Sequence, residues 1–438
     1  MKRRTPMVIA ATAAIALTLT ACGGSDGDTA GSTSGGDGKV TLSLAGWSLA
    51  STPEFKTIAD AFTAQNPNVT VELKEYDATN YDTQMTADLA AGTAPDIFVQ
   101  KNLKMFYTYQ SGQQLLDVSD VTNALDAATG GKDAYTVDGK SYAVPYRQDS
   151  WVLYYNKDLF NKAGVALPDG SWTWDDYANA AKAVTTGLKG AGSKALGTYQ
   201  HSWQSTVQGF ALAQTAGADL ASGDFSYLKP YYERVLDLQD AGAQVPLGTV
   251  TTNSLTYQAQ FGTQQAAMLP MGSWYIATLL QQQANGEAED FEWGIAPAPQ
   301  LDASTAGTSA TPVTFADPTG LGINPGIDKG KVDAAKKFLA FAAGEGGAQA
   351  LAKIGITPAL LSDAVTDTYF GLEGIPTDDL SKFAWQTHDT RPENPVLPTT
   401  AILQNILNDF HTAVLSGSVS VDDGLAEAAA RAKSEASF

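Results

Sequence analysis

The fold is decided by residues 139–165, whose sequence is GKSYAVPYRQDSWVLYYNKDLFNKAGV. The first part, residues 139–146, predicts a short pair of strands joined by a turn. The second part, residues 151–155, is an unbroken run of aromatic and aliphatic residues, which is typical of a buried strand. Asn156 and the two polar residues after it end that strand. Two strand regions therefore follow each other closely along this stretch.

The chain before residue 139 alternates between strand and helix patterns. Residues 40–44, 69–73 and 96–99 have the alternation or the apolar composition of strands. Apolar residues recur at helical spacing over residues 55–62 and again over residues 81–89. Alternation of strand and helix at this spacing predicts a mostly parallel α/β sheet.

The chain after residue 165 contains further elements of both kinds. Thr173 is the expected N-cap of a helix, because its hydroxyl can accept from a free N–H of the first turn. Helices are predicted over residues 173–184, 231–238, 274–283, 332–341 and 402–414, and strands over residues 266–271 and 291–296.

The N-terminus has the pattern of a secretory signal. Lys2, Arg3 and Arg4 precede an uncharged apolar stretch over residues 7–20, which is short for a membrane span. The sequence Leu-Thr-Ala-Cys ends that stretch at Cys22 and is similar to the bacterial lipobox, which implies a signal peptide over residues 1–21 and lipidation of Cys22. The alternative is an ordinary signal peptide with an incidental buried cysteine.

Composition restricts what the mature chain can be. Residues 22–38 are rich in Gly, Ser, Thr and Asp and predict a flexible tether behind the lipidated cysteine. A chain with one cysteine has neither an intramolecular disulfide framework nor a cysteine-cluster zinc site. The formal net charge of −20 argues against a nucleic-acid partner, which requires a basic surface.

Four motifs together resemble the extracellular solute-binding proteins of ABC sugar importers, of the maltose/maltodextrin-binding type. They are Ala94-Pro95-Asp96-Ile97, the stretch 139–165, the sequence WTWDD over residues 172–176, and MGSW over residues 271–274. The resemblance covers the chain from about residue 39 to its end. It implies an α/β periplasmic-binding-protein-like fold of type II, with two lobes, hinge crossovers and a ligand cleft between the lobes.

The resemblance also implies a domain organisation. Crossovers are expected near residues 145–149, 295–300 and 341–344. Lobe one would then comprise residues 39–147 plus 298–343, and lobe two residues 148–297 plus 344–438. Closure of such hinged lobes around a ligand is a known mode of motion.

A sugar ring presents apolar C–H faces that pack on aromatic rings, and hydroxyls that donate and accept hydrogen bonds. The resemblance places a stacking aromatic at Trp274 and a ligand contact at Trp47. Trp203, in a polar loop, and Trp385, expected in a loop with Gln386 and Thr387, are further candidate ligand residues. The other tryptophans are expected in strands or at a helix start: Trp151, Trp172, Trp174 and Trp293.

Polar candidates follow the same reasoning. The resemblance implies a ligand-binding carboxylate at Asp149, beside which Arg147 either contacts ligand or pairs with that carboxylate. Gln100 and Asn102 follow the third predicted strand, at the sheet edge where α/β proteins bind ligands. Two loop residues complete the implied set: Gly320 and Arg391.

These expectations define a binding protein and not an enzyme. The sequence has no HExxH zinc motif and no P-loop, and we expect no metal and no cofactor. The resemblance implies a monomeric lipoprotein on the outer face of the cytoplasmic membrane, which captures a carbohydrate, with an oligosaccharide favoured, and delivers it to the transmembrane subunits of an ABC permease. Two alternatives stay open: a secreted lipid-anchored glycoside hydrolase, and a solute-binding protein for a non-sugar ligand.

Overall fold

The computed structural model describes residues 38–50 and 53–436. The predicted signal peptide, the lipidation site at Cys22 and all but the last residue of the predicted tether lie outside the described residues. Among the residues that are described, no helix has the length and apolar character needed to cross a membrane. The described part begins with the first predicted strand, β1 (Val40–Trp47).

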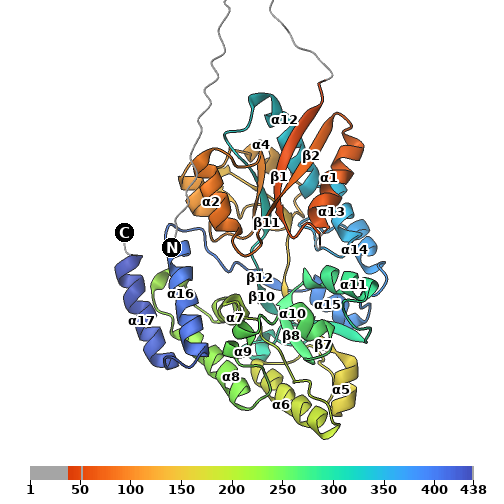
Figure 1. Cartoon of the computed structure of the whole chain (residues 1–438), viewed down its shortest axis with the longest axis vertical. Helices are drawn as coiled ribbons and strands as arrows, with labels where there is room; N and C mark the ends of the chain where they lie inside the picture. Colours follow the sequence, from red (N-terminus) through yellow and green to blue (C-terminus); the bar gives the residue numbers. More distant parts are fainter. Residues whose placement is uncertain (1–37, 51–52, 437–438) are drawn as a thin grey trace, which may run out of the picture. The chain divides into compact units, whose positions relative to one another are not determined.

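The first sheet has the strand order β2-β1-β3-β11-β6 (Figure 1). Strand β1 pairs in parallel with β2 and β3, whereas β11 runs antiparallel to both β3 and β6. The prediction of a mostly parallel sheet is correct here except for β11, which returns from a distant part of the chain in the opposite direction, while β6 runs in the same direction as β1, β2 and β3. The other strands are β2 (Val69–Tyr76), β3 (Ile97–Gln100), β6 (Val144–Arg147) and β11 (Thr319–Ile323).

The second sheet has the order β8-β7-β9, with β7 (Trp151–Asn156) antiparallel to both neighbours. All residues of β7, β8 (Met268–Gly272) and β9 (Trp293–Pro297) are buried. The stretch 139–165 thus supplies the edge strand β6 of one sheet and the central strand β7 of the other. Two small pairs complete the strands: β4 (Thr136–Val137) with β5 (Lys140–Ser141), and β10 (Val313–Phe315) with β12 (Asp389–Arg391).

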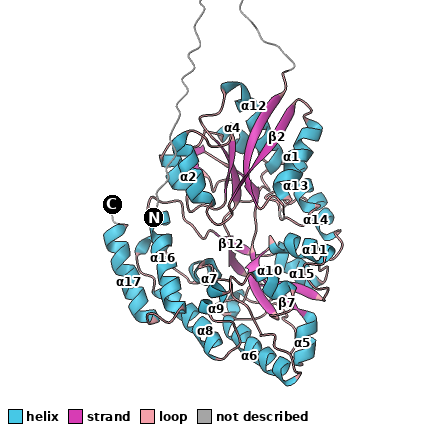
Figure 2. Ribbon diagram, in the orientation of Figure 1, coloured by secondary structure: helices cyan, strands magenta, loops and turns pink. Residues whose placement is uncertain are grey.

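Helices cover both sheets (Figure 2). Helices α1 (Glu54–Gln65), α12 (Val332–Ala343) and α13 (Glu345–Ala352) pack on one another; α1 also contacts β2, and α12 contacts β6. The remaining helices are α2 (Tyr81–Ala91), α3 (Phe106–Ser111), α4 (Ser119–Asn123), α5 (Lys157–Ala163), α6 (Trp174–Gly190), α7 (Ser205–Gln214), α8 (Lys229–Asp240), α9 (Leu247–Thr252), α10 (Tyr257–Gly262), α11 (Tyr275–Asn285), α14 (Asp363–Phe370), α15 (Asp379–Gln386), α16 (Thr400–Leu415) and α17 (Val421–Glu435).

The start of α6 confirms the predicted N-cap. The Thr173 hydroxyl accepts a hydrogen bond from the backbone N–H of Asp176, and the Asp176 carboxylate accepts one from the backbone N–H of Thr173. This capping box satisfies two backbone donors that a helix start would otherwise leave unpaired. Trp174 follows directly and is buried, as are Trp151 and Trp293, whose expected strand positions are confirmed.

Two separate hydrophobic clusters form the interior, one around each main sheet. Judged by the buried residues, the chain passes from one cluster to the other over residues 146–151, 316–321 and 356–360, while α13 contributes to both. The second and third passages lie after the predicted crossovers at residues 295–300 and 341–344, because β10 packs in the second cluster and Ile356 still packs in the first. Since cluster membership does not by itself define a lobe, the lobe boundaries stay predictions.

Two of these passages run side by side. The backbone N–H of Ala359 donates to the Tyr146 carbonyl at 3.0 Å, and that of Gln148 donates to the Thr357 carbonyl at 3.3 Å. The segments 146–148 and 357–359 therefore form a short two-strand connection between the clusters.

Candidate ligand-binding site

The sheet topology gathers several predicted site residues at one edge of the first sheet. Trp47, Gln100 and Arg147 are the last residues of β1, β3 and β6, three strands that run in the same direction. Gly320 of the antiparallel strand β11 lies opposite Gln100 in the register. The carboxyl edge of a sheet is where α/β proteins place ligands, so the register brings four candidates to one place.

Gly320 has a packing role at this edge. A Cβ atom on Gly320 would lie 2.5 Å from the ring of Tyr135, so no larger residue fits without movement. The Tyr135 hydroxyl in turn donates to the carbonyls of Pro318, at 2.5 Å, and Gln100, at 3.3 Å. Gly320 thus lets Tyr135 hold the ends of β3 and β11 together.

Gln100 carries an unused hydrogen-bonding group. The residue is 1% exposed, and neither its side-chain oxygen nor its side-chain nitrogen has a hydrogen-bond partner within the described residues. A buried amide without partners costs free energy in the folded protein, roughly 1–3 kcal/mol. Buried polar groups of native proteins are nearly always paired, so this amide is available to a bound water or to a ligand group that reaches it.

Trp47 and Asn102 lie on the same side of the first sheet as Gln100. The Trp47 ring packs edge-on against Phe55 and Tyr81, at centroid distances of 5.0 and 5.1 Å, and is partly buried. The ammonium of Lys101 lies 5.0 Å from the Trp47 ring centroid. Asn102 is also partly buried, and its side-chain oxygen accepts from the backbone N–H of Lys104 at 3.0 Å. The Asn102 amide nitrogen is the group that this contact leaves for other partners.

Arg147 lies between two carboxylates. Its Nη1 donates to Glu54 in the first turn of α1, and its Nε lies 2.8 Å from Asp149. The side chain of Arg147 is 12% exposed. Burial by itself lowers the pKa of Arg147, but the charges of Glu54 and Asp149 outweigh it and raise that pKa above its ordinary value. The sequence prediction left open whether Arg147 pairs with Asp149; the two side chains are paired.

Asp149 connects Arg147 and Glu54 to the second sheet. Its Oδ1 accepts from the Ser273 hydroxyl at 2.8 Å, and the backbone N–H of Ser273 donates to the Ser150 carbonyl at 2.9 Å. Burial raises the pKa of the Asp149 carboxyl, although Arg147 and Ser273 both act to lower it. Ser273 directly precedes Trp274, the N-cap residue of α11. Residues 149 and 150 of the crossover are thereby hydrogen-bonded to Ser273, the neighbour of the predicted stacking residue Trp274.

Four aromatic side chains lie together beside that tie and are called the aromatic cluster below: His201, Trp203, Tyr257 and Trp274. Ring centroids are 4.5 Å apart for His201 and Trp203, 5.7 Å for Trp203 and Tyr257, and 6.4 Å for Trp203 and Trp274. Trp203 is 42% exposed, while Trp274 is partly buried and packs edge-on against Trp151 at 5.3 Å. The cluster therefore presents at least one large apolar ring that the fold does not cover.

His201 and Tyr257 were not predicted as site residues. His201 precedes Trp203 by two positions, and that spacing was the signal available in the sequence; Tyr257 is distant in sequence and had none. The ring nitrogen Nδ1 of His201 lies 3.2 Å from the Tyr199 hydroxyl, and burial lowers the pKa of His201 to about 4. His201 is therefore neutral at pH 7 and acts as a packing partner of Trp203.

Trp385 does not have the exposed loop position that the prediction expected, whereas the ligand contact of Arg391 stays a prediction. Trp385 lies in α15 and not in a loop, is 2% exposed, stacks on Tyr369 at 4.4 Å, and donates from Nε1 to Thr357 at 3.1 Å. Its ring faces are covered by the second cluster, so it has no face free for a ligand. Arg391 ends β12, pairs with Asp389 at 3.0 Å and donates to the Ala213 carbonyl at 2.6 Å.

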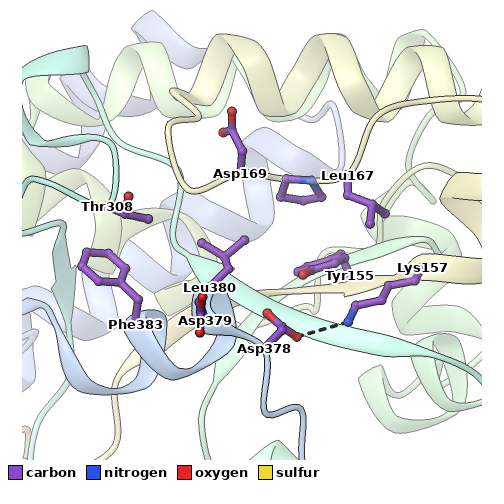
Figure 3. A pocket seen from close by; sticks show the side chains of 10 residues that line it. Tyr155, Lys157, Leu167, Asp169, Thr308, Asp378, Asp379, Leu380 and Phe383 are labelled. Atoms are coloured by element: carbon purple, nitrogen blue, oxygen red, sulfur yellow. Dashed lines mark hydrogen bonds and ion pairs between the residues drawn. The ribbon is translucent and has the colours of Figure 1, made fainter.

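A pocket of about 620 Å³ lies elsewhere, on the second cluster (Figure 3). Leu167, Leu380 and Phe383 contribute apolar surface to it, and the ammonium of Lys157 pairs with Asp378 at 3.1 Å on its rim. None of its lining residues was predicted to contact ligand, so volume alone does not identify the candidate site.

Comparison with known proteins gives consistent results. The profile of the family described as bacterial extracellular solute-binding protein matches residues 46–349. A sugar transporter from Rhizobium etli, solved in an open conformation, is 33% identical, with a TM-score of 0.75, and the match covers 90% of this chain and 99% of that one.

Curated relatives match over shorter segments. A binding protein of Brucella abortus is 30% identical over 153 residues, which is 34% of this chain and 37% of the relative. The sn-glycerol-3-phosphate-binding periplasmic protein UgpB of Escherichia coli is 29% identical over 175 residues, or 35% of this chain and 36% of that protein. The chain thus spans little more than a third of the length of these curated relatives.

Proposed function

The chain belongs to the bacterial extracellular solute-binding proteins, and we propose that it captures a carbohydrate by closing two lobes around it. The observation that carries the proposal is the aromatic cluster, whose Trp203 is 42% exposed. An exposed tryptophan offers an apolar face to the C–H surface of a sugar ring, and it is otherwise unfavourable on a protein surface. Several rings side by side suit an oligosaccharide.

Polar groups from the edge of the first sheet complete the proposed site. The unpartnered amide of Gln100 has two donors and an acceptor for sugar hydroxyls, and the free amide nitrogen of Asn102 adds donors. Trp47 offers a second aromatic surface on this side. A ligand that contacts both the edge of the first sheet and the aromatic cluster would stabilise the closed arrangement of the lobes, because only the closed arrangement makes both sets of contacts. The similarity to the Rhizobium etli sugar transporter supports this assignment.

The cellular context is part of the proposal. We propose that the mature protein is a monomer, held by lipid on Cys22 at the outer face of the cytoplasmic membrane, and that residues 22–38 are its tether. The loaded protein would deliver its ligand to the transmembrane subunits of an ABC permease. Lobe one would comprise residues 39–147 plus 298–343 and lobe two the remaining folded residues, with the boundaries to be adjusted by experiment.

The proposed action is binding without reaction. A glycoside hydrolase needs a pair of carboxyl groups free to act as acid and as nucleophile or base. Asp149, which accepts from Ser273 beside Trp274, and Glu54 are both paired with Arg147. Release of monosaccharide by the purified protein would favour the hydrolase alternative.

A thermal-shift screen against mono-, di- and trisaccharides, followed by calorimetric titration of the best sugar, tests the proposal. Ligand that binds only the folded state raises the apparent stability by mass action. Replacement Trp274→Ala is expected to weaken binding of that sugar by more than about tenfold. Failure of every sugar to shift the transition, or unchanged affinity of the variant, would contradict the assignment. A shift with amino acids, peptides or polyamines in place of sugars would favour the non-sugar alternative.

A further inference from the structure

The guanidinium of Arg147 is flanked by two carboxylates. Its Nη1 donates to Glu54, and its Nε forms an ion pair with Asp149 at 2.8 Å. Glu54 is fully buried and Asp149 is 4% exposed. One positive charge is thus held between two negative charges, and this three-residue group is called the charge triad below.

The two lysines beside the same sheet edge are also near carboxylates. Lys101 donates to the Ala78 carbonyl at 2.7 Å and lies near Asp82. Lys104 donates to the side-chain oxygen of Asn405 at 2.9 Å and lies near Asp82 and Glu393. Burial lowers the pKa of both lysines, while the charge of Asp82 acts to raise it.

A phosphate ester would therefore meet an unfavourable environment at this site. Proteins that recognise phosphate direct bidentate arginine or unpaired lysine groups at it. Here a dianion would be placed near two buried carboxylates, and like charges at close range in a medium of low polarity repel strongly. The hydroxyls of a neutral sugar meet no such penalty and can use the amide of Gln100.

We infer that the site binds an uncharged carbohydrate and excludes phosphorylated sugars and phosphorylated polyols. In the charge triad, the two carboxylates neutralise the positive charge of Arg147 that a phosphate group would need. The inference rests on the proposed function and adds the charge class of the ligand to it. The inferred ligand class differs from that of the relative UgpB, which is named for binding sn-glycerol 3-phosphate.

The test compares matched neutral and phosphorylated probes by calorimetric titration of the mature protein. The pairs are the best neutral sugar of the screen with its 6-phosphate, and glycerol with sn-glycerol 3-phosphate. The wild-type protein is expected to bind the phosphorylated sugar at least about a hundredfold more weakly than its neutral parent. Two variants, Glu54→Gln and Asp149→Asn, each remove one negative charge beside Arg147 and are expected to reduce that ratio of affinities by about tenfold or more.

Asp60→Asn is the matched control. It removes one carboxylate from the same helix as Glu54, but from an exposed pair with Lys56, and it is expected to leave the ratio unchanged. Using a ratio keeps the test valid for variants of reduced stability. If wild-type protein binds a phosphate ester as tightly as the neutral parent, the charge inference is overturned while carbohydrate capture stands. If no carbohydrate binds, charged or neutral, the proposed function fails and the inference falls with it.

Discussion

The Oδ1 atom of Asp149 accepts a hydrogen bond from the Ser273 hydroxyl at 2.8 Å, and this bond joins the chain segment between the two sheets to the start of α11. Ser273 also accepts from the Thr357 hydroxyl at 3.3 Å, in the passage over residues 356–360. Two of the three passages between the clusters thus meet at the residue that precedes Trp274. The sequence resemblance assigned Asp149 to the ligand, which stays a prediction; within the protein its two oxygens contact Ser273 and Arg147.

Replacement Ser273→Ala tests whether this bond positions the aromatic cluster. The Asp149 carboxylate would lose a buried donor, so the free energy of unfolding is expected to fall by about 1–3 kcal/mol. Sugar affinity is expected to fall several-fold, because the start of α11 loses its tie to the crossover. Denaturant unfolding and calorimetric titration give the two quantities. Ser111→Ala, at an exposed serine, serves as the control, and equal sugar affinity in both variants would argue against a positioning role.

Two tryptophans of opposite exposure separate binding from stability. Trp203→Ala is expected to reduce sugar affinity by more than about tenfold while changing stability little, because its ring is 42% exposed. Trp385→Ala is expected to destabilise the protein by about 3–5 kcal/mol, because the ring is buried on Tyr369 and leaves a cavity. Urea unfolding and titration of both variants give the comparison. A stability loss in Trp203→Ala as large as that in Trp385→Ala would show that Trp203 is a packing residue.

The unpartnered amide of Gln100 predicts an unusual result for an apolar replacement. Gln100→Met keeps the length of the side chain and removes both polar atoms, so the ligand-free protein is expected to be as stable as the wild type or more stable. Sugar affinity is expected to fall by about 1–3 kcal/mol, because hydroxyls in the site lose their partner. Chemical unfolding without sugar, together with calorimetry, measures both effects. A marked loss of stability without loss of affinity would mean that the amide serves the fold.

His201 predicts a loss of stability in acid. Its pKa is lowered by burial from an ordinary value of 6.5 to about 4, so between these values the unfolded chain binds a proton that the native protein does not. Stability contributed by neutral His201 is present above pH 6.5 and is lost as the pH falls toward 4. His201→Phe is expected to reduce this pH dependence, as measured by denaturant unfolding at a series of pH values. An identical slope in the variant would contradict the assignment. His411, buried in α16 with its pKa also lowered to about 4, contributes a similar dependence that the variant retains.

Glu393 has the opposite effect and must be considered in the same measurements. Burial and the nearby charge of Asp317 raise its pKa to about 7. The native protein therefore holds this proton between the ordinary value of 4.5 and about 7, and its contribution to stability is lost as the pH rises through that range. Measurement of Glu393→Gln alongside His201→Phe separates the two slopes.

Local pattern and composition determined much of the architecture. The apolar run at residues 151–155 is typical of a buried strand, and Thr173 followed three residues later by Asp176 specifies a helix start through bonds within one turn. The signals for strands β1 to β3 were equally local. The resemblance to solute-binding proteins, carried by residues 139–165 and three shorter motifs, added the two-lobe fold.

Only the tertiary structure decided which side chains meet. Glu54 pairs with Arg147 across 93 residues of sequence, and Asp149 meets Ser273 across 124. No local pattern encodes such a contact, because it depends on the register of β6 beside β11 and on the pairing of β7 with β8. The burial of Trp385 and the exposure of Trp203 have the same origin: a tryptophan has the same chemistry at both positions, and its role depends on which surfaces the folded chain leaves uncovered.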